Sequence, residues 1–250
     1  MRVERIEPDL YLAIGDAYDS NATIFLSAKE ALVIDALASK RDAHDLKHLI
    51  EQNFEAAVRF FVCTHYFSDH LAALKLFPHS QIIAHKNYRQ TFDQERFRSA
   101  EEASFFVEPT ILMSDELTIR WGRFHLNLFY NPAHTTGTIN IDIPEADLIH
   151  VSDTIVGNMV YIAYSSPDAF FPGLEKIKQR GRKKLISSHQ GLRNIEAIHH
   201  AESYLRTLQQ RLKEHDSKIT LQECMPPDVE ATPFENIFHK RNVQWLSGNS

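Results

Sequence analysis

Hydrophobic residues in the first third of the chain group into short runs bounded by Asp, Ser, Asn and Lys. Runs of this kind are typical of β-strands, and they predict strands at residues 11–16, 22–27 and 31–35. Between residues 41 and 52 the spacing changes, because apolar side chains recur at helical intervals and predict a helix. The largely apolar, β-rich run at residues 58–64 predicts a buried strand.

The middle of the chain continues this alternation. Residues 69–77 predict a helix that begins near Asp69, and residues 81–85 predict another strand. Residues 87–109 are amphipathic, and a helix is the most regular structure that their pattern would allow. We therefore expect an insertion beside the strand ends there. Four β-rich runs follow, at residues 117–121, 124–130, 138–144 and 147–153.

The last third of the chain is mainly helical. We expect a helix at residues 172–180, a last strand at 183–188, and a long helix from Asn194 to about His215. A closing helix is expected at residues 234–246. Strands thus occur in two blocks, each followed by helices, with no linker or repeat between them. The pattern predicts a single α/β domain over residues 1–250, with two sheets inside and helices outside.

Composition and charge narrow the classes of function. The 250 residues are 43% hydrophobic and 24% charged, which is ordinary for a folded domain. The net charge is −6 and no basic cluster is present, which argues against a nucleic-acid partner. The sequence shows neither an export signal nor an apolar run that could span a membrane. Cys63 and Cys224 are the only cysteines, so we expect no disulfide scaffold and a cytoplasmic location.

Histidines and aspartates follow the ends of four predicted strands. The stretch CTHYFSDH opens at the end of the strand at 58–64, and PAHTTG, SDT and SHQG follow three later strands. These segments carry the candidate site residues His65, Asp69, His70, His134, Asp153 and His189. Imidazole and carboxylate groups are suitable ligands for Zn, Fe or Mn, so the strand ends predict a metal site.

The order of these segments resembles the metallo-β-lactamase-fold superfamily. The chain shows H-x-F-x-D-H where those proteins have H-x-H-x-D-H, then P-x-H-T-x-G, a strand ending in Asp, and a strand ending in H-x-G. NATIFLSAKEALVIDA and HKRNVQWL are similar to the early strands and the closing helix of the same proteins. The resemblance covers essentially the whole chain and implies a four-layer αβ/βα sandwich.

The resemblance also implies one or two transition-metal ions, with zinc preferred and iron or manganese as alternatives. In that arrangement His65 and His134 bind the first ion, and Asp69, His70 and His189 bind the second. Asp153 bridges the two ions.

Phe67 departs from the family pattern. The common motif has a histidine at this position, and a phenyl ring has no lone pair to offer a metal. The first ion would keep only two imidazoles and the bridging carboxylate. Phe67 is either a hydrophobic side chain that fills part of the pocket and excludes water from it, or a ring that faces the substrate.

Four further roles are assigned provisionally to side chains near the motifs. Asp35 resembles the acid that orients a ligating histidine, although a turn or cap would also explain it. Asp69 can bind metal, hold the attacking water, or cap the helix predicted to begin there. Tyr161 and Tyr164 follow Asp153 in an irregular segment, where they would wall the substrate pocket or pack in the core.

The preferred function is a metal-dependent hydrolase for a small organic substrate, namely an ester, lactone or amide. A metal-bound hydroxide would be the nucleophile, and Asp69 its orienting base. A phosphodiester is disfavoured because no cationic clamp is evident near the motifs. Two alternatives stay open: a non-heme mono- or di-iron oxidoreductase, and a non-catalytic metal-containing binding protein. A homodimer is also left open.

Overall fold

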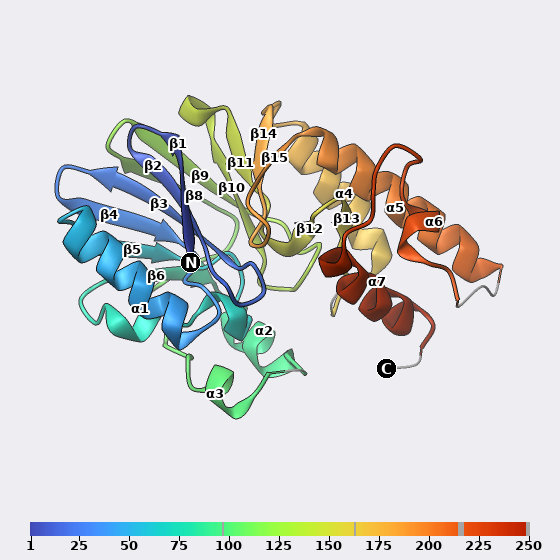
Figure 1. Cartoon of the computed structure of the whole chain (residues 1–250), viewed down its shortest axis with the longest axis horizontal. Coiled ribbons are helices and arrows are strands. Elements are labelled where there is room, and N and C mark those ends of the chain that lie inside the picture. The colour runs from blue at the N-terminus through green and yellow to red at the C-terminus, as the bar shows by residue number, and fades with distance from the viewer. Residues whose placement is uncertain (97, 163, 215–217, 249–250) are drawn as a thin grey trace.

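Two β-sheets form the centre of the structure, a computed structural model that describes residues 1–96, 98–162, 164–214 and 218–248 (Figure 1). The first sheet contains β1 to β7 in chain order, and the second has the order β15-β14-β11-β10-β9-β8. A separate short hairpin joins β12 and β13. The strands are β1 Arg2–Glu7, β2 Leu10–Ile14, β3 Asn21–Ser27, β4 Glu30–Ile34, β5 Ala57–Val62, β6 Gln81–His85, β7 Ile111–Met113, β8 Glu116–Trp121, β9 Phe124–Tyr130, β10 Ile139–Ile143, β11 Leu148–His150, β12 Ile155–Val156, β13 Met159–Val160, β14 Lys184–Ile186 and β15 Leu192–Asn194.

Helices cover the outer faces of the two sheets and one end of the sandwich (Figure 1). Helix starts carry capping side chains: Ser39 accepts from the backbone of Asp42, and Thr232 and Glu235 form a capping box. Within the described ranges, none of the helices has the length and apolar character needed to cross a membrane. The helices are α1 Lys40–His48, α2 Tyr88–Gln94, α3 Ala100–Ala103, α4 Pro167–Lys178, α5 Glu196–Lys213, α6 Leu221–Cys224 and α7 Pro233–Leu246.

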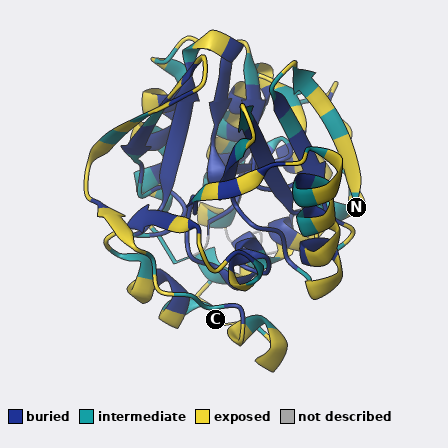
Figure 2. Cartoon of the chain, turned by 90° about the vertical axis from the view of Figure 1, so that its left-hand side faces the viewer, coloured by how far each residue is buried: buried dark blue, intermediate teal, exposed yellow. Residues whose placement is uncertain are grey.

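Three buried hydrophobic clusters lie between successive layers. The central cluster joins the two sheets and includes Phe25 on β3 and Phe124 on β9. A second cluster holds α1 on the first sheet through Leu46, and a third includes Leu174 on α4 and Leu205 on α5. Figure 2 shows the strands mostly buried and the outer faces of the helices exposed. Helix, sheet, sheet and helix form four layers, which confirms the predicted αβ/βα sandwich.

The segment after β5 differs from the prediction. One helix was expected over residues 69–77, but two single 3₁₀ turns are present, Ser68–His70 and Leu74–Leu76. The intervening backbone bonds to a neighbouring loop, because the N–H of Ala72 donates to the carbonyl of Leu37 at 3.1 Å. A partner outside the segment replaces the i−4 carbonyl that a continuous α-helix requires, so the predicted helix is wrong.

The predicted start of one helix and the predicted last strand are also wrong. Helix α4 begins at Pro167 rather than Pro172, because the preceding Ser166 accepts a hydrogen bond from the N–H of Asp168 and caps the helix there. The strand predicted to be the last is β14, but β15 follows and pairs with it antiparallel. Helix α5 is described to Lys213, and His215, the predicted end of this helix, lies outside the described residues.

The aromatic contact between the two sheets provides a test of the central layer. Phe124 is 1% exposed and meets Phe25 edge-on, with ring centroids 5.2 Å apart. We expect Phe124→Ala to lower the free energy of unfolding by about 3–5 kcal/mol, because it leaves a cavity between the sheets. Chemical denaturation measures this change. The control Val3→Ala, at a side chain 41% exposed on β1, should change stability by less than about 0.5 kcal/mol. Equal losses in the two variants would contradict the assigned central core.

Candidate metal centre

The loops that follow five strands meet at one edge of the two sheets. Strands β4 and β5 are parallel, and so are β11 and β14, so each pair directs its C-terminal ends the same way. Backbone bonds join the two sheets there, from Ile139 N–H to the Thr64 carbonyl at 2.8 Å and from Asn21 N–H to the Ser188 carbonyl at 2.8 Å. These loops bring together all six residues predicted as ligands, namely His65, Asp69, His70, His134, Asp153 and His189.

Asp153 lies at the centre of the six side chains. Its Oδ2 atom is 3.2 Å from Nε2 of His189, 3.8 Å from Nε2 of His70, 3.9 Å from Nε2 of His65 and 4.0 Å from Nε2 of His134. The four imidazoles are fully buried, and the side chain of Asp153 is only 2% exposed. One carboxylate is therefore surrounded by four imidazoles with almost no access to water.

The six donors divide into two sets, within each of which all donor atoms lie within 4.8 Å of one another. The first set is His65, His134 and Asp153, and the second set is Asp69, His70 and His189. The division coincides with the one that the resemblance implies. The assignment of these residues as ligands remains a prediction.

In two of the histidine rings, a hydrogen bond made by Nδ1 determines that Nε2 is the nitrogen that directs a lone pair toward Asp153. Nδ1 of His134 lies 2.9 Å from the carbonyl of Tyr161, and Nδ1 of His189 lies 2.8 Å from the carbonyl of Tyr18. A carbonyl only accepts, so each Nδ1 carries a proton, and in the neutral ring Nε2 is a lone pair. A histidine that binds metal commonly donates its other N–H to a carbonyl in this way.

Several inward-facing atoms have no hydrogen-bond partner within the described residues. They are Nε2 of His65, His70 and His134 and Oδ1 of Asp153, all buried. Buried polar atoms without a partner are costly, and lone pairs that converge on a carboxylate repel it unless a positive charge lies between them. The donor set therefore fits one or two transition-metal ions on chemical grounds.

Burial and mutual charge perturb the protonation of these groups. Burial lowers the pKa of His134. Burial alone would also lower the pKa of His70, but Asp69 and Asp153 outweigh it and raise the pKa to about 10. For Asp153 burial would raise the pKa, yet His189 holds it well below its usual range. A cation in this site displaces protons from the imidazoles, so its affinity falls as the pH falls.

Asp35 lies beneath the second set but does not hydrogen-bond to His70, a histidine of that set. Its Oδ2 is 3.9 Å from Nδ1 of His70. The carboxylate instead accepts from the backbone N–H of Thr64 at 2.8 Å and from the hydroxyls of Thr64 at 2.9 Å and Ser188 at 2.8 Å. Thr64 and Ser188 each directly precede a candidate ligand. Asp35 thus contacts the neighbours of two candidate ligands, and its role in orienting a histidine remains a prediction.

Phe67 occupies the side of the first set. Its ring centroid lies 5.1 Å from that of His65, 5.4 Å from that of His134 and 5.5 Å from that of Tyr164, each in an edge-on arrangement. The side chain is buried, yet it also lines the cavity beside the site. The ring thus excludes water from the first set and presents a surface to the cavity, so its two predicted roles are compatible.

A cavity of about 60 Å³ opens beside the two sets. At about 30 Å³ for each water molecule in the liquid, it has room for roughly two waters. Tyr161 and Tyr164, the two tyrosines predicted as pocket residues, both line it with Asp69. The space next to the donors is therefore small, partly aromatic and bounded by two of the candidate ligands, Asp69 and Asp153.

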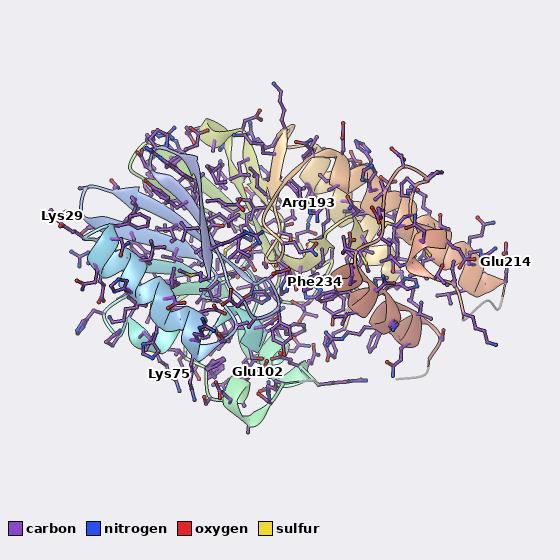
Figure 3. The ribbon with its side chains drawn as sticks, viewed as in Figure 1. Lys29, Lys75, Glu102, Arg193, Glu214 and Phe234 are labelled. Carbon is purple, nitrogen blue, oxygen red and sulfur yellow. The ribbon has the colours of Figure 1, made fainter. Side chains whose placement is uncertain are left out.

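Sequence reasoning missed five residues of the cavity wall, the first of which is Tyr18 between β2 and β3. Glu95 follows α2 and Glu102 lies on α3, in the segment predicted only as an insertion, and Phe238 and Arg241 lie on α7. In Figure 3 Glu102 lies below the sheets, on α3. Nη1 of Arg241 donates to the Tyr161 hydroxyl at 3.3 Å. The motifs themselves carry no cationic side chain that faces the donors, but α7, about fifty residues after the last motif, places an arginine beside them.

Comparisons with known proteins agree with this architecture. No protein-family model and no curated protein matches the sequence. The metallo-β-lactamase from Pontibacter korlensis superposes with a TM-score of 0.68 and 17% identity, over 82% of this chain and 98% of its own. DIM-1 metallo-β-lactamase also gives 0.68 and 17%, over 82% of this chain and 97% of its own.

A larger protein with a different activity is also similar. The stereoselective inverting sec-alkylsulfatase Pisa1 from Pseudomonas sp. superposes with a TM-score of 0.69 and 14% identity, over 92% of this chain. The chain spans 45% of the length of that protein. Lactamases and a sulfatase thus share one arrangement with this chain. The chain has the metallo-β-lactamase fold, as the order of its site segments predicted.

Phe67 provides a direct test of the first set. We expect Phe67→His to increase the affinity of the first set for zinc at least about tenfold, since it adds an imidazole beside two existing ones. Titration against a chromophoric zinc chelator measures the change. Phe67→Leu removes the ring without adding a donor and serves as the control. If the histidine variant binds zinc no better than the leucine variant, position 67 does not adjoin a metal site.

Proposed function

We propose that the chain is a metal-dependent hydrolase that acts on a small organic substrate. The observation that carries the proposal is the set of buried Nε2 atoms without partners around Asp153. The fold shared with lactamases and a sulfatase supports it. The two sheets share one core, which supports the further proposal that residues 1–250 form one domain.

The two sets would hold the ions as predicted, one set for each ion with Asp153 between them. A bound transition-metal ion would supply a Lewis acid and make water a nucleophile at neutral pH. His134 and His189 are held in position by hydrogen bonds to the backbone carbonyls of Tyr161 and Tyr18, respectively. Zinc fits a site of imidazoles and carboxylates and remains the preferred metal.

Asp69 is suited to the role of orienting base. Its side chain is 23% exposed, whereas the other five donors are between 0% and 2% exposed. Its carboxylate contacts both neighbours in the second set, at 3.3 Å from Nε2 of His70 and 3.6 Å from Nε2 of His189. It is therefore the more exposed of the two carboxylates, Asp69 and Asp153, that belong to the two sets and line the cavity. From there it can orient water and accept its proton.

The cavity wall supports a particular kind of substrate. Phe67, Tyr161 and Phe238 offer aromatic surface, and the Arg241 guanidinium offers a charge-assisted contact. We therefore retain esters, lactones and amides as the substrate class. The small cavity volume limits the part of the substrate that enters beside the donors.

One observation favours a second candidate function. The first set has two imidazoles and one carboxylate, and Phe67 contributes no donor. Two histidines and a carboxylate with open positions are the ligand set of non-heme Fe(II) oxygen chemistry. An iron oxidoreductase would therefore use the same residues.

Metal content separates these functions. We expect protein purified without added metal to contain about two zinc ions per chain, measured by plasma mass spectrometry. His70→Ala should lose about one ion, because it removes a donor of the second set, whereas His199→Ala, at an exposed residue of α5, should lose none. Iron with visible absorption would favour the oxidoreductase. A single ion without turnover would favour a non-catalytic binding protein.

Asp69 is tested by its isosteric amide. We expect Asp69→Asn to lower kcat by about 10²–10⁴-fold, because the amide cannot accept a proton from water. The assay uses neutral and anionic nitrophenyl esters with the zinc-loaded protein. Asp45→Asn changes a carboxylate that is 47% exposed on α1 and should leave kcat unchanged. An unaltered kcat in an Asp69→Asn protein with its full metal content would refute the assigned base.

A further inference from the structure

Glu95 is a buried carboxylate that no predicted role accounts for. It directly follows α2, in the segment between β6 and β7, and its side chain is only 12% exposed. It lines the same cavity as Phe67 and Asp69. A carboxylate this deeply buried needs strong partners, since an unpaired buried charge is costly.

Both hydrogen bonds that the Glu95 carboxylate accepts come from one residue of the site, and Nη1 of Arg98 lies 4.0 Å from its Oε2. Its Oε2 accepts from the backbone N–H of Ser68 at 2.9 Å, and its Oε1 accepts from the Ser68 hydroxyl at 2.7 Å. Ser68 is the first residue of the 3₁₀ turn Ser68–His70. The two bonds fix both the backbone and the side chain of the residue that joins Phe67 to Asp69.

The first N–H of the turn finds its partner in a different segment of the chain. Ser68 opens the turn, so its N–H has no acceptor within it, and Phe67 at the N-cap makes no side-chain capping hydrogen bond. Glu95 accepts from this N–H. On its other side, the carbonyl of His70 accepts from Ala36 N–H at 2.9 Å.

We propose that Glu95 is a positioning residue for the second set, because it holds the turn that directs Asp69 and His70 toward His189. This inference rests on the proposed metal-dependent function. Glu95 reaches the turn from the α2–α3 segment and fixes the residue that joins Phe67 to Asp69. Partners that orient ligands in this indirect way affect metal affinity by about 10–100-fold.

A purely structural role for Glu95 predicts a different outcome. In that case the carboxylate only ties the α2–α3 segment to the body of the protein, as does the bond from Arg96 N–H to the Tyr164 hydroxyl at 2.8 Å. Its loss would then lower stability and leave the metal affinity of the second set unchanged. The two roles are separated by measuring affinity and thermal stability in the same variants.

The experiment titrates the full chain, freed of metal, with Co²⁺ and follows its visible absorption. We expect Glu95→Ala to weaken the binding of one of two ions by about 10–100-fold. Glu95→Gln can accept from Ser68 N–H and hydrogen-bond to the hydroxyl, so it should restore affinity to within about threefold of wild type, well inside that 10–100-fold range. The matched control is Glu101→Ala, which changes a glutamate that is 55% exposed on α3 and should have no effect.

A second background identifies the ion concerned. In His70→Ala, where the second set already lacks a donor, adding Glu95→Ala should leave the affinity for the remaining ion unchanged. If Glu95→Ala binds both ions like wild type, or weakens both ions equally with a lower Tm, the inference is overturned and the proposed function stands. If wild-type protein binds no Co²⁺ or Zn²⁺, the proposed function is overturned together with this inference.

Discussion

The attraction between the Asp153 carboxylate and a positive charge placed among four imidazoles is the interaction on which the site depends. Nε2 atoms of His65, His70, His134 and His189 lie 3.2–4.0 Å from its Oδ2. Their carbonyl partners leave at least two of these nitrogens as lone pairs that face a negative charge, unless a proton or a metal ion intervenes. Protons can satisfy such a cluster only in part, since four imidazolium ions in one buried volume would repel one another. One divalent cation in each set would meet all the donors of that set, which is why the geometry supports a metal centre.

The fold meets this electrostatic demand through loops anchored between two sheets. Bonds from Asn21 to Ser188 and from Ile139 to Thr64 join the sheets directly beneath the donors. Asp35 adds a buried carboxylate that accepts from Thr64 and Ser188, the neighbours of two candidate ligands. The hydrophobic contacts between the layers supply stability, and these polar contacts supply orientation. The ligand positions are therefore set by the packing of the whole sandwich.

Much of the fold was predictable because the strands are apolar runs with clear ends, and the site segments follow those ends in a fixed order. The six candidate ligands could be named for the same reason. Local pattern failed where partners are distant: the expected helix after Asp69 is replaced by turns because Ala72 bonds to Leu37, and α4 starts at Pro167 because Ser166 caps it. Glu95 and Arg241 could not be predicted as cavity residues, since only the three-dimensional fold brings α2 and α7 to the donors. The same limit applies to Ser68, whose N–H and hydroxyl donate to Glu95 in another segment.

Anomalous X-ray scattering at the zinc edge, from crystals of the zinc-loaded protein, tests the central claim most directly. The account predicts a peak on each side of Asp153, at about 2.0–2.2 Å from the Nε2 atoms of His134 and of His189. Peaks found only elsewhere in the molecule, with these nitrogens unbound, would contradict it.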